Sequence, residues 1–229
     1  MTRFPGYCVL GLALVLTPGA SALRAADAQP TPAEALKRLK EGNVRFQEDK
    51  PAPRDASMKK RVKLAMEQHP FAVVLTCADS RVSPELIFDQ GLGDLFVLRV
   101  AGNITDPGVV GSIEYAVEHL KCPLIVVLGH ESCGAVKAAM HLEEVHGNLG
   151  ALIEQVRVGK DLPKDAKAAL EAAVKTNVLH HAGELTHKST VLKDFVASGR
   201  VQVMAGVYSL TTSDVSWLEL PKPKNKQGR

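Results

Sequence analysis

Short apolar runs alternate with amphipathic segments along most of this chain. Three runs rich in β-branched and aliphatic residues cover 71–76, 95–100 and 123–129, and helical patterns lie between them at 84–88 and 107–120. Continuous apolar strands separated by helices are typical of a parallel sheet that is covered on both faces. We therefore predict an α/β fold with such a sheet at its centre.

The segments on either side of this core carry further helix and strand patterns. Residues 32–49 are predicted to form an amphipathic helix, because Thr31 can cap it and Glu34, three residues later, completes a capping box. The other predicted elements are a helix at 57–68, a helix at 134–146, one or two helices within 162–198 and a last strand at 201–209.

The start of the chain has the pattern of an export signal. Arg3 supplies a positive charge, residues 7–16 form an apolar run, and small residues follow, as at a cleavage site. The run is too short to cross a bilayer comfortably, which argues against a retained anchor. We expect residues 1–28 to be a signal peptide and residues 29–229 to be one domain of a periplasmic or secreted protein.

Charge gives no sign of a polyanionic partner. The 229 residues contain 28 Lys and Arg against 25 Asp and Glu, a net charge of +3. The basic stretches at 59–61 and 222–229 have no interleaved aromatic residues and form no stripe. We therefore expect no nucleic-acid partner, and no membrane association after signal cleavage.

Two polar segments that follow apolar strands carry the candidate chemistry. Segment 77–82 (CADSRV) directly follows the first run, and segment 129–134 (GHESCG) begins where the third run ends. Because the carboxyl ends of parallel strands meet at one edge of a sheet, Cys77, His130 and Cys133 are expected to converge there. Two cysteines and one histidine suit zinc, and three protein ligands leave the fourth position open, as in catalytic zinc sites.

Asp79 and Arg81 are predicted to act beside the metal. They occupy alternate positions and can pair if the chain is still extended. The guanidinium would keep the carboxylate ionised and oriented, ready to accept a proton from zinc-bound water or to become a fourth ligand in a closed state. The start of a helix at Cys133 favours its thiolate, and Gly134 lets the backbone pass close to the metal.

Other interpretations of the cysteines stay open at this point. Cys77, Cys122 and Cys133 remain after signal cleavage, and an oxidising compartment favours disulfides. A thiol-redox protein with a Cys77–Cys133 bridge is one alternative, and a non-catalytic zinc or scaffold protein is another. Cys122 is expected to be a small core residue. Surface positions are expected for His180, His181, His187, Glu85, Asp89 and Asp94.

Segments 77–82 and 129–134 together resemble the two signature segments of β-class carbonic anhydrases. The resemblance extends from about Ala35 to Leu218 and excludes the signal segment. It implies a mixed sheet with four central parallel strands and a first helix, the N-terminal helical arm, that extends across a partner. It also implies dimers or tetramers with active sites at the subunit interface and one Zn²⁺ per subunit. Further matching stretches are 42–46, 96–99, 101–103 and 111–116.

The activity implied by this resemblance is a lyase reaction, the zinc-dependent reversible hydration of carbon dioxide to bicarbonate and a proton. Hydrolysis of carbonyl sulfide or carbon disulfide on the same fold is the alternative. Because two thiolates already neutralise the charge of the zinc ion, we expect a weaker Lewis acid than in a three-histidine site. Hydration should then become faster toward alkaline pH.

The resemblance also assigns a substrate pocket. Gln68 resembles the glutamine that hydrogen-bonds substrate in the plant-like subgroup, and Phe96 and Tyr115 match its apolar and aromatic pocket positions. Gly134 completes the expected substrate-binding set. Val74 stands where the bicarbonate-inhibited subgroup carries a tryptophan, so that regulatory site is expected to be missing.

Overall fold

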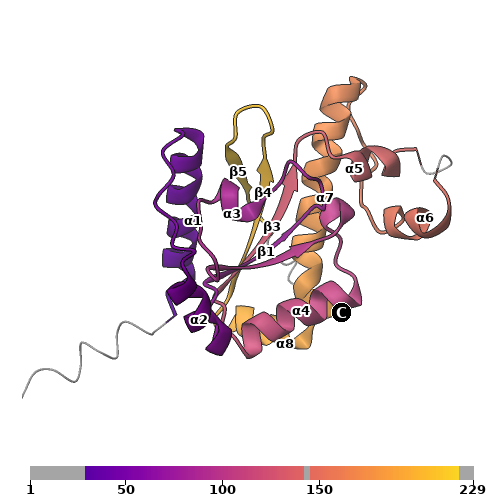
Figure 1. Cartoon of the computed structure of the whole chain (residues 1–229). Helices are drawn as coiled ribbons and strands as arrows, with labels where there is room; N and C mark the ends of the chain where they lie inside the picture. The colour runs from indigo at the N-terminus through magenta and orange to yellow at the C-terminus, as the bar shows by residue number, and fades with distance from the viewer. Residues whose placement is uncertain (1–28, 142–144, 222–229) are drawn as a thin grey trace, which may run out of the picture.

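A mixed sheet with helices on both faces forms the centre of the computed structural model, which describes residues 29–141 and 145–221 (Figure 1). The strand order is β2-β1-β3-β4-β5. The first four strands are parallel, and β5 runs antiparallel to β4. The strands are β1 (Ala72–Thr76), β2 (Leu95–Arg99), β3 (Leu124–His130), β4 (Gln202–Tyr208) and β5 (Val215–Leu218). The predicted α/β fold with central parallel strands is confirmed.

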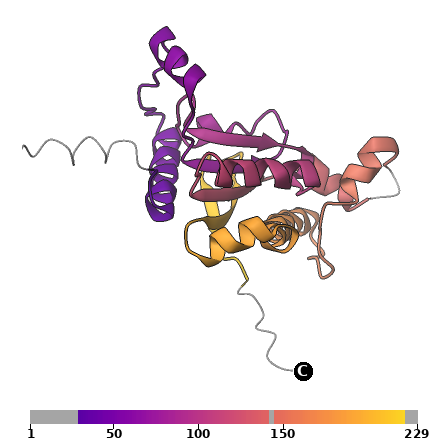
Figure 2. The same ribbon diagram turned by 90° about the horizontal axis from the view of Figure 1, so that it is seen from below.

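Alternating side chains of the strands face two different groups of helices. Val73 and Leu75 of β1 pack in a core with α4, α7 and α8, whereas Ala72 and Val74 pack with α1 and α3. Accordingly, α1 and α7 lie on opposite sides of the sheet (Figures 1 and 2). The helices are α1 (Pro32–Gln47), α2 (Met58–Met66), α3 (Pro84–Ile87), the 3₁₀ turn η1 (Ala101–Asn103), α4 (Pro107–Glu118), α5 (Gly134–Ala139), α6 (Gly147–Ile153), α7 (Ala166–Lys188) and α8 (Thr190–Ala197).

The first helix begins at the predicted capping box. The Thr31 hydroxyl accepts the N–H group of Glu34, and the Glu34 carboxylate accepts the N–H group of Thr31 at 2.8 Å. Its buried face lies against its own chain: a Cβ added at Gly42 would lie 1.8 Å from the carbonyl oxygen of Phe88. Glycine is therefore required where α1 crosses the end of α3.

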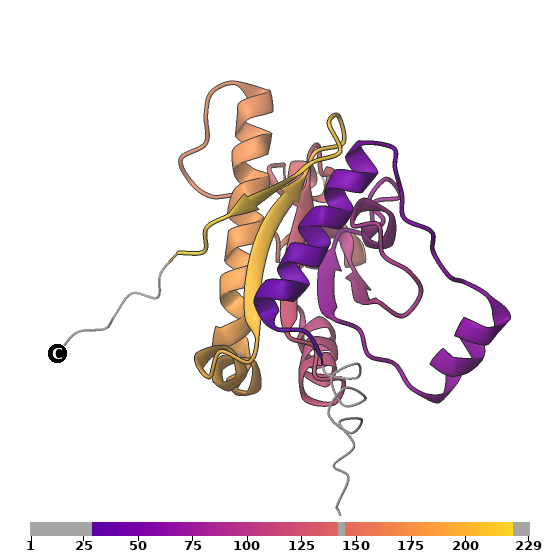
Figure 3. The ribbon, with the colours of Figure 1, turned by 90° about the vertical axis from the view of Figure 1, so that its left-hand side faces the viewer.

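Helix α2 stands apart from the rest of the molecule (Figure 3). Ser57 caps it by accepting the N–H group of Lys60, and none of its residues is buried. Met58, Val62 and Met66 are 66%, 59% and 86% exposed. Three large apolar side chains on one short helix therefore face solvent in the single chain, an unusual concentration for a helix surface.

The structure corrects one predicted element and adds one that was not predicted. The predicted helix at 134–146 ends at Ala139, where the N–H group of Met140 bonds back to Lys137 in a tightened last turn. A separate helix starts at Gly147, whose φ of +62° does not fit a continuous helix. Strand β5 was not predicted, because four residues are too few to show a pattern.

The described residues contain no helix that is both long and apolar enough to cross a membrane. The predicted signal peptide at 1–28 and the basic tail at 222–229 lie outside the described residues.

Candidate metal centre

The carboxyl ends of β1 and β3 bring two sulfurs and one imidazole together. Cys77 directly follows β1, His130 is the last residue of β3, and Cys133 is the N-cap of α5. Their ligand atoms all lie within 4.8 Å of one another, and the two sulfurs are 4.0 Å apart. All three side chains are buried, with exposures of 4%, 0% and 1%.

This geometry fits a tetrahedral ion. Two sulfurs that each lie about 2.3 Å from a tetrahedral zinc ion are about 3.8 Å apart. His130 supports the same position, because its Nδ1 lies 2.9 Å from the carbonyl oxygen of Glu131 and would donate to it. Its Nε2 is then left as the lone-pair nitrogen, and that buried atom has no hydrogen-bond partner among the described residues. The residues therefore suit a zinc ion held by Cys77, His130 and Cys133.

Backbone N–H groups surround the two sulfurs. Gly102 donates to Cys77 at 3.4 Å, and Asp79 donates to the same sulfur. The pKa of Cys77 is lowered, chiefly because the Cys133 thiol donates a hydrogen bond to it, with further help from these N–H groups. The pKa of Cys133 is raised, because its S–H group donates a hydrogen bond to Cys77 and because it is buried; N–H groups at the start of α5 only partly offset this.

The same distance shows that the two sulfurs are not bridged. A disulfide requires the two sulfurs to be about 2.05 Å apart. Cys77 and Cys133 stand 4.0 Å apart, and Cys77, Cys122 and Cys133 are all free thiols. The pair is spaced as two ligands of one ion.

Asp79 lies beside the open side of this group and is held by Arg81. Its Oδ1 accepts from the backbone N–H and Nε of Arg81 at 3.0 and 2.9 Å, and its Oδ2 accepts from Nη2 at 2.7 Å. These Arg81 bonds hold the pKa of the carboxyl well below its ordinary value. Asp79 Oδ2 is 3.9 Å from His130 Nε2, close to where the ion would lie.

The backbone around this pair differs from the expectation. The chain is not extended between the two residues but turns, with the N–H group of Val82 donating to the Asp79 carbonyl at 3.1 Å. The turn lets Arg81 reach the carboxylate with its main chain and its side chain at once. Arg99 supports the turn from β2 by donating to the carbonyl oxygens of Cys77 and Asp79 at 3.2 and 2.6 Å.

Glu131 fixes the second candidate segment, 129–134, to a neighbouring loop. Its Oε2 accepts from the hydroxyls of Ser209 and Thr211 and from the N–H group of Leu210, each at 3.1 Å. The loop after β4 is thereby tied to the residue that directly follows His130. Sequence reasoning assigned no role to Glu131 or Arg99; their only signal was a place inside the matching motifs.

Comparisons with known proteins agree with this geometry. A family model described as carbonic anhydrase matches residues 72–215. A carbonic anhydrase of Mycolicibacterium smegmatis is 42% identical over 189 residues, covering 80% of this chain and 92% of the relative. Carbonic anhydrase 2 of Mycobacterium tuberculosis is 41% identical over 184 residues, covering 78% and 89%. A solved β-carbonic anhydrase of Coccomyxa, in complex with acetazolamide, has a TM-score of 0.63 at 27% identity, covering 88% and 87%.

The chain belongs to the β-class carbonic anhydrase family. Another similar structure is one of two tetrameric β-carbonic anhydrases from Sordaria macrospora. It has a TM-score of 0.64 at 25% identity and covers 81% of this chain and 94% of the relative.

In the single chain of this β-carbonic anhydrase, three of the four predicted pocket residues lie away from the carboxyl ends of the strands, where Cys77, His130 and Cys133 meet. Phe96 pairs with Val73, about 13 Å of strand before Cys77. The Tyr115 ring lies 6.4 Å from Phe96 and is 48% exposed, and Gln68 is exposed before β1 begins. These three side chains gather toward the amino ends of the strands.

Gly134 is the pocket residue that does lie at the metal edge. It follows Cys133 directly and lines a cavity of about 260 Å³ with Lys137 and His141. A Cβ added at this glycine would meet no atom within 4 Å, so packing among the described residues does not itself require glycine there.

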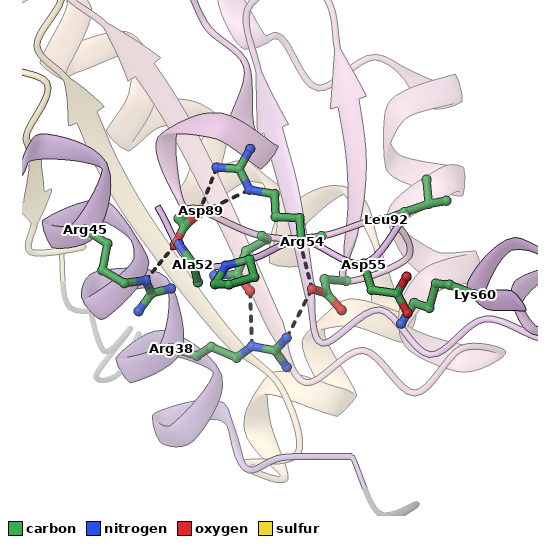
Figure 4. Close-up of a pocket in the computed structure, with 12 residues that line it drawn as sticks. Arg38, Arg45, Ala52, Arg54, Asp55, Lys60, Asp89 and Leu92 are labelled. Carbon is green, nitrogen blue, oxygen red and sulfur yellow. Dashed lines mark hydrogen bonds and ion pairs between the residues drawn. The ribbon is translucent and has the colours of Figure 1, made fainter. Parts of the chain in front are cut away.

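The structure also corrects two predicted surface residues. Asp89 is buried: its carboxylate accepts from Arg45 Nε at 2.6 Å, Arg54 Nη2 at 2.8 Å and the N–H group of Ala52 at 2.9 Å (Figure 4). These ion pairs line a cavity of about 210 Å³ in which none of the three metal-binding residues takes part. His181 is also buried, at 2% exposure, because it faces Thr105 in the segment after η1.

Proposed function

We propose that this chain is a zinc-dependent carbonic anhydrase that interconverts carbon dioxide with bicarbonate and a proton. The observation that carries the proposal is the buried Cys77–His130–Cys133 group with an arginine-held carboxylate at its open side. A purely structural zinc site ordinarily has four Cys or His ligands. Three such ligands with Asp79 beside them are the arrangement of a catalytic site.

Zinc is the proposed ion, one per subunit. Two thiolates and an imidazole are a donor set typical of zinc, and the separation of the sulfurs fits tetrahedral coordination. Bound here, zinc would lower the pKa of a water molecule and so supply a nucleophile for carbon dioxide. Metal analysis of the purified protein should give about one zinc per chain.

Asp79 would orient the attacking water molecule and accept a proton from it. Its Oδ2 faces the open side of the site, and Arg81 keeps that oxygen ionised. An ionised carboxylate accepts a hydrogen bond from the water and so orients it; because Arg81 lowers its pKa, the carboxyl would pass on any proton it takes rather than keep it. In a closed state the same oxygen could instead ligate zinc, which would exclude substrate until Arg81 draws it back.

The substrate pocket is proposed to be completed by a second copy of the chain. Gln68, Phe96 and Tyr115 match the plant-like subgroup but lie at the far edge of the sheet from their own metal-binding residues. The exposed apolar face of α2, formed by Met58, Val62 and Met66, is suited to burial against another chain. We therefore expect a dimer or tetramer, which size-exclusion chromatography with light scattering would measure.

Export is proposed from the pattern of residues 1–28. The mature protein should then begin near residue 29 in the periplasm or outside the cell. N-terminal sequencing of the protein recovered from a periplasmic fraction checks this, and an intact Met1 in the cytoplasmic fraction would contradict it.

The deciding experiment measures metal content and carbon dioxide hydration on the same preparation by stopped flow. We expect zinc-dependent hydration whose rate rises between pH 7 and pH 9, because two thiolates weaken the Lewis acid. A zinc-loaded protein without hydration activity would point to a non-catalytic scaffold. Parallel assays with carbonyl sulfide and carbon disulfide test the hydrolase alternative, which predicts the larger kcat/KM on those substrates.

A further inference from the structure

We propose that Asn177, on α7, is a positioning residue for the metal centre. It fixes Gly102, whose N–H group donates a hydrogen bond to the sulfur of Cys77. The proposal rests on the proposed function, since it concerns how the protein holds its zinc ion. Asn177 lies outside both signature segments, 75 residues from Gly102 in the sequence.

Both polar atoms of the Asn177 side chain are engaged in the interior. The residue is fully buried. Its Nδ2 donates to the Gly102 carbonyl at 2.8 Å, and its Oδ1 accepts from the N–H group of Arg157 at 2.9 Å. A buried amide with both sides satisfied has one orientation, so its Nδ2 can hold Gly102 in one place.

Gly102 depends on such a partner because it has no side chain with which to anchor itself. Its φ is +71°, in the left-handed region that favours glycine. A Cβ there would lie 2.8 Å from a methyl group of Val156, so a larger residue could not take over the anchoring. The carbonyl and the N–H group of this one residue face different partners, Asn177 on one side and Cys77 on the other.

One turn further along α7, the same helix face holds the chain that follows η1. His181 Nδ1 accepts from the N–H group of Thr105 at 3.2 Å, and Lys188 Nζ donates to the Thr105 carbonyl at 2.7 Å. Residues four apart lie on one face of a helix, so Asn177 and His181 form a continuous support. Of the two points they hold, Gly102 is the one that contacts a metal-binding residue.

The consequence for the metal is electronic as well as geometric. An N–H group that donates to a thiolate stabilises negative charge on the sulfur. The sulfur then donates less electron density to the metal ion. Partners of this kind orient the ligands and tune the metal, and their loss typically costs about 10- to 100-fold in metal affinity or activity. Without Asn177, Gly102 would shift and the Cys77 sulfur would lose its donor.

The test is Asn177→Asp, which keeps an acceptor for Arg157 but replaces the donor to Gly102 with an oxygen. The chain offers a matched control in Asn43→Asp. Asn43 is also a buried helix asparagine, donates to the carbonyl oxygens of Ile87 and Ser213, and accepts from the N–H group of Val215. It makes these contacts from α1, on the opposite face of the sheet from α7.

Two readouts separate positioning from mere stability. Zinc affinity, measured by chelator competition, should fall about 10- to 100-fold in Asn177→Asp and stay unchanged in Asn43→Asp. In the cobalt-substituted proteins, the thiolate-to-cobalt charge-transfer band should shift in the first variant only. If Asn177→Asp does not fold, Asn177→Ser, which adds no charge, replaces it.

Wild-type affinity together with an unshifted band in the Asn177 variant would overturn the proposal, as would equal losses in both variants. Failure of the proposed function is distinguishable from this result. It would appear as a wild-type protein that binds zinc, and that shows the thiolate-to-cobalt charge-transfer band when loaded with cobalt, but that does not hydrate carbon dioxide.

Discussion

The two ends of the parallel strands differ in how complete they are within one chain. At the carboxyl ends, Cys77, His130 and Cys133 are buried, and neighbouring backbone groups orient them. Toward the amino ends, Gln68 is exposed and Tyr115 is half-exposed, and both lie away from the three candidate metal-binding residues. One chain therefore brings together a group that could hold a metal ion, whereas we propose that a second chain brings the groups expected to contact substrate.

A comparison of two buried cysteines makes the same point at one residue type. Cys122 precedes β3 and is as buried as Cys77, but its thiol has a different environment and donates to the carbonyl of Pro70 at 3.0 Å. Burial raises the pKa of Cys122 to about 12. Burial alone thus keeps a thiol protonated, and hydrogen-bond donors around the sulfur are what prepare Cys77 as a ligand.

The largest expected effect is the loss of a ligand. Cys133→Ser should remove zinc and lower kcat/KM by about a thousandfold or more, because the bound metal lowers the activation barrier by several kcal/mol. Cys122→Ser is the matched control, a buried cysteine at the other end of the same strand, and should keep full metal content. Metal analysis with stopped-flow hydration measures both, and zinc loss in the control instead would break the contrast between the two strand ends.

A smaller loss is expected when the metal stays but the base is removed. Asp79→Asn should retain zinc and lower kcat by about 100-fold, because the neutral amide cannot accept the proton. Asp55→Asn is a suitable control, since Asp55 also accepts the N–H group two residues ahead, that of Ser57 at 2.9 Å. Near-wild-type hydration by Asp79→Asn would contradict the role given to this carboxylate.

At the amino ends, Gln68→Ala should lower kcat/KM by about tenfold, the cost of one hydrogen bond to substrate. Gln202→Ala, another exposed glutamine at the start of a strand, should have no effect. If a second copy supplies Gln68, mixing Gln68→Ala with an inactive Cys133→Ser chain should restore part of the activity through mixed assemblies. No recovery in mixed assemblies verified by mass spectrometry would argue that each chain builds its pocket alone.

The smallest effect on catalysis is expected at Asp89, which lines a cavity that does not include Cys77, His130 or Cys133, and where the consequence is stability. Burial alone raises the pKa of Asp89, but Ala52, Arg45 and Arg54 outweigh it and lower the pKa below 3.8. Because the folded pKa is depressed, this stabilisation is complete at neutral pH and is lost as the pH falls through the folded value, below about pH 4.

Asp89→Asn should therefore cost about 2 kcal/mol of unfolding free energy at pH 7, a loss that shrinks in acid. Urea unfolding of the metal-loaded protein at pH 7 and in acid measures it, with Asp55→Asn again as the exposed control. A pH-independent difference between the variant and the wild type would show that the Arg45 and Arg54 pairs add no net stability.

Local features of this protein were predictable from the sequence alone. The capping box at Thr31 and Glu34 involves residues three apart, and the apolar runs of β1 and β3 stop where polar residues begin. Topology then brings Cys77, His130 and Cys133 to one edge, because parallel strands share the direction of their carboxyl ends. Such inferences need only near neighbours and a general rule of sheet geometry.

Other contacts were decided by the tertiary structure. Asp89 was expected at the surface, yet it is buried against Arg45 and Arg54, which lie 44 and 35 residues away. Asn177 reaches Gly102 across 75 residues. Whether a polar side chain meets such a partner depends on how α1 and α7 pack on the sheet. Sequence spacing carries no information on that packing, because the same local pattern fits a solvated side chain as well as a buried, paired one.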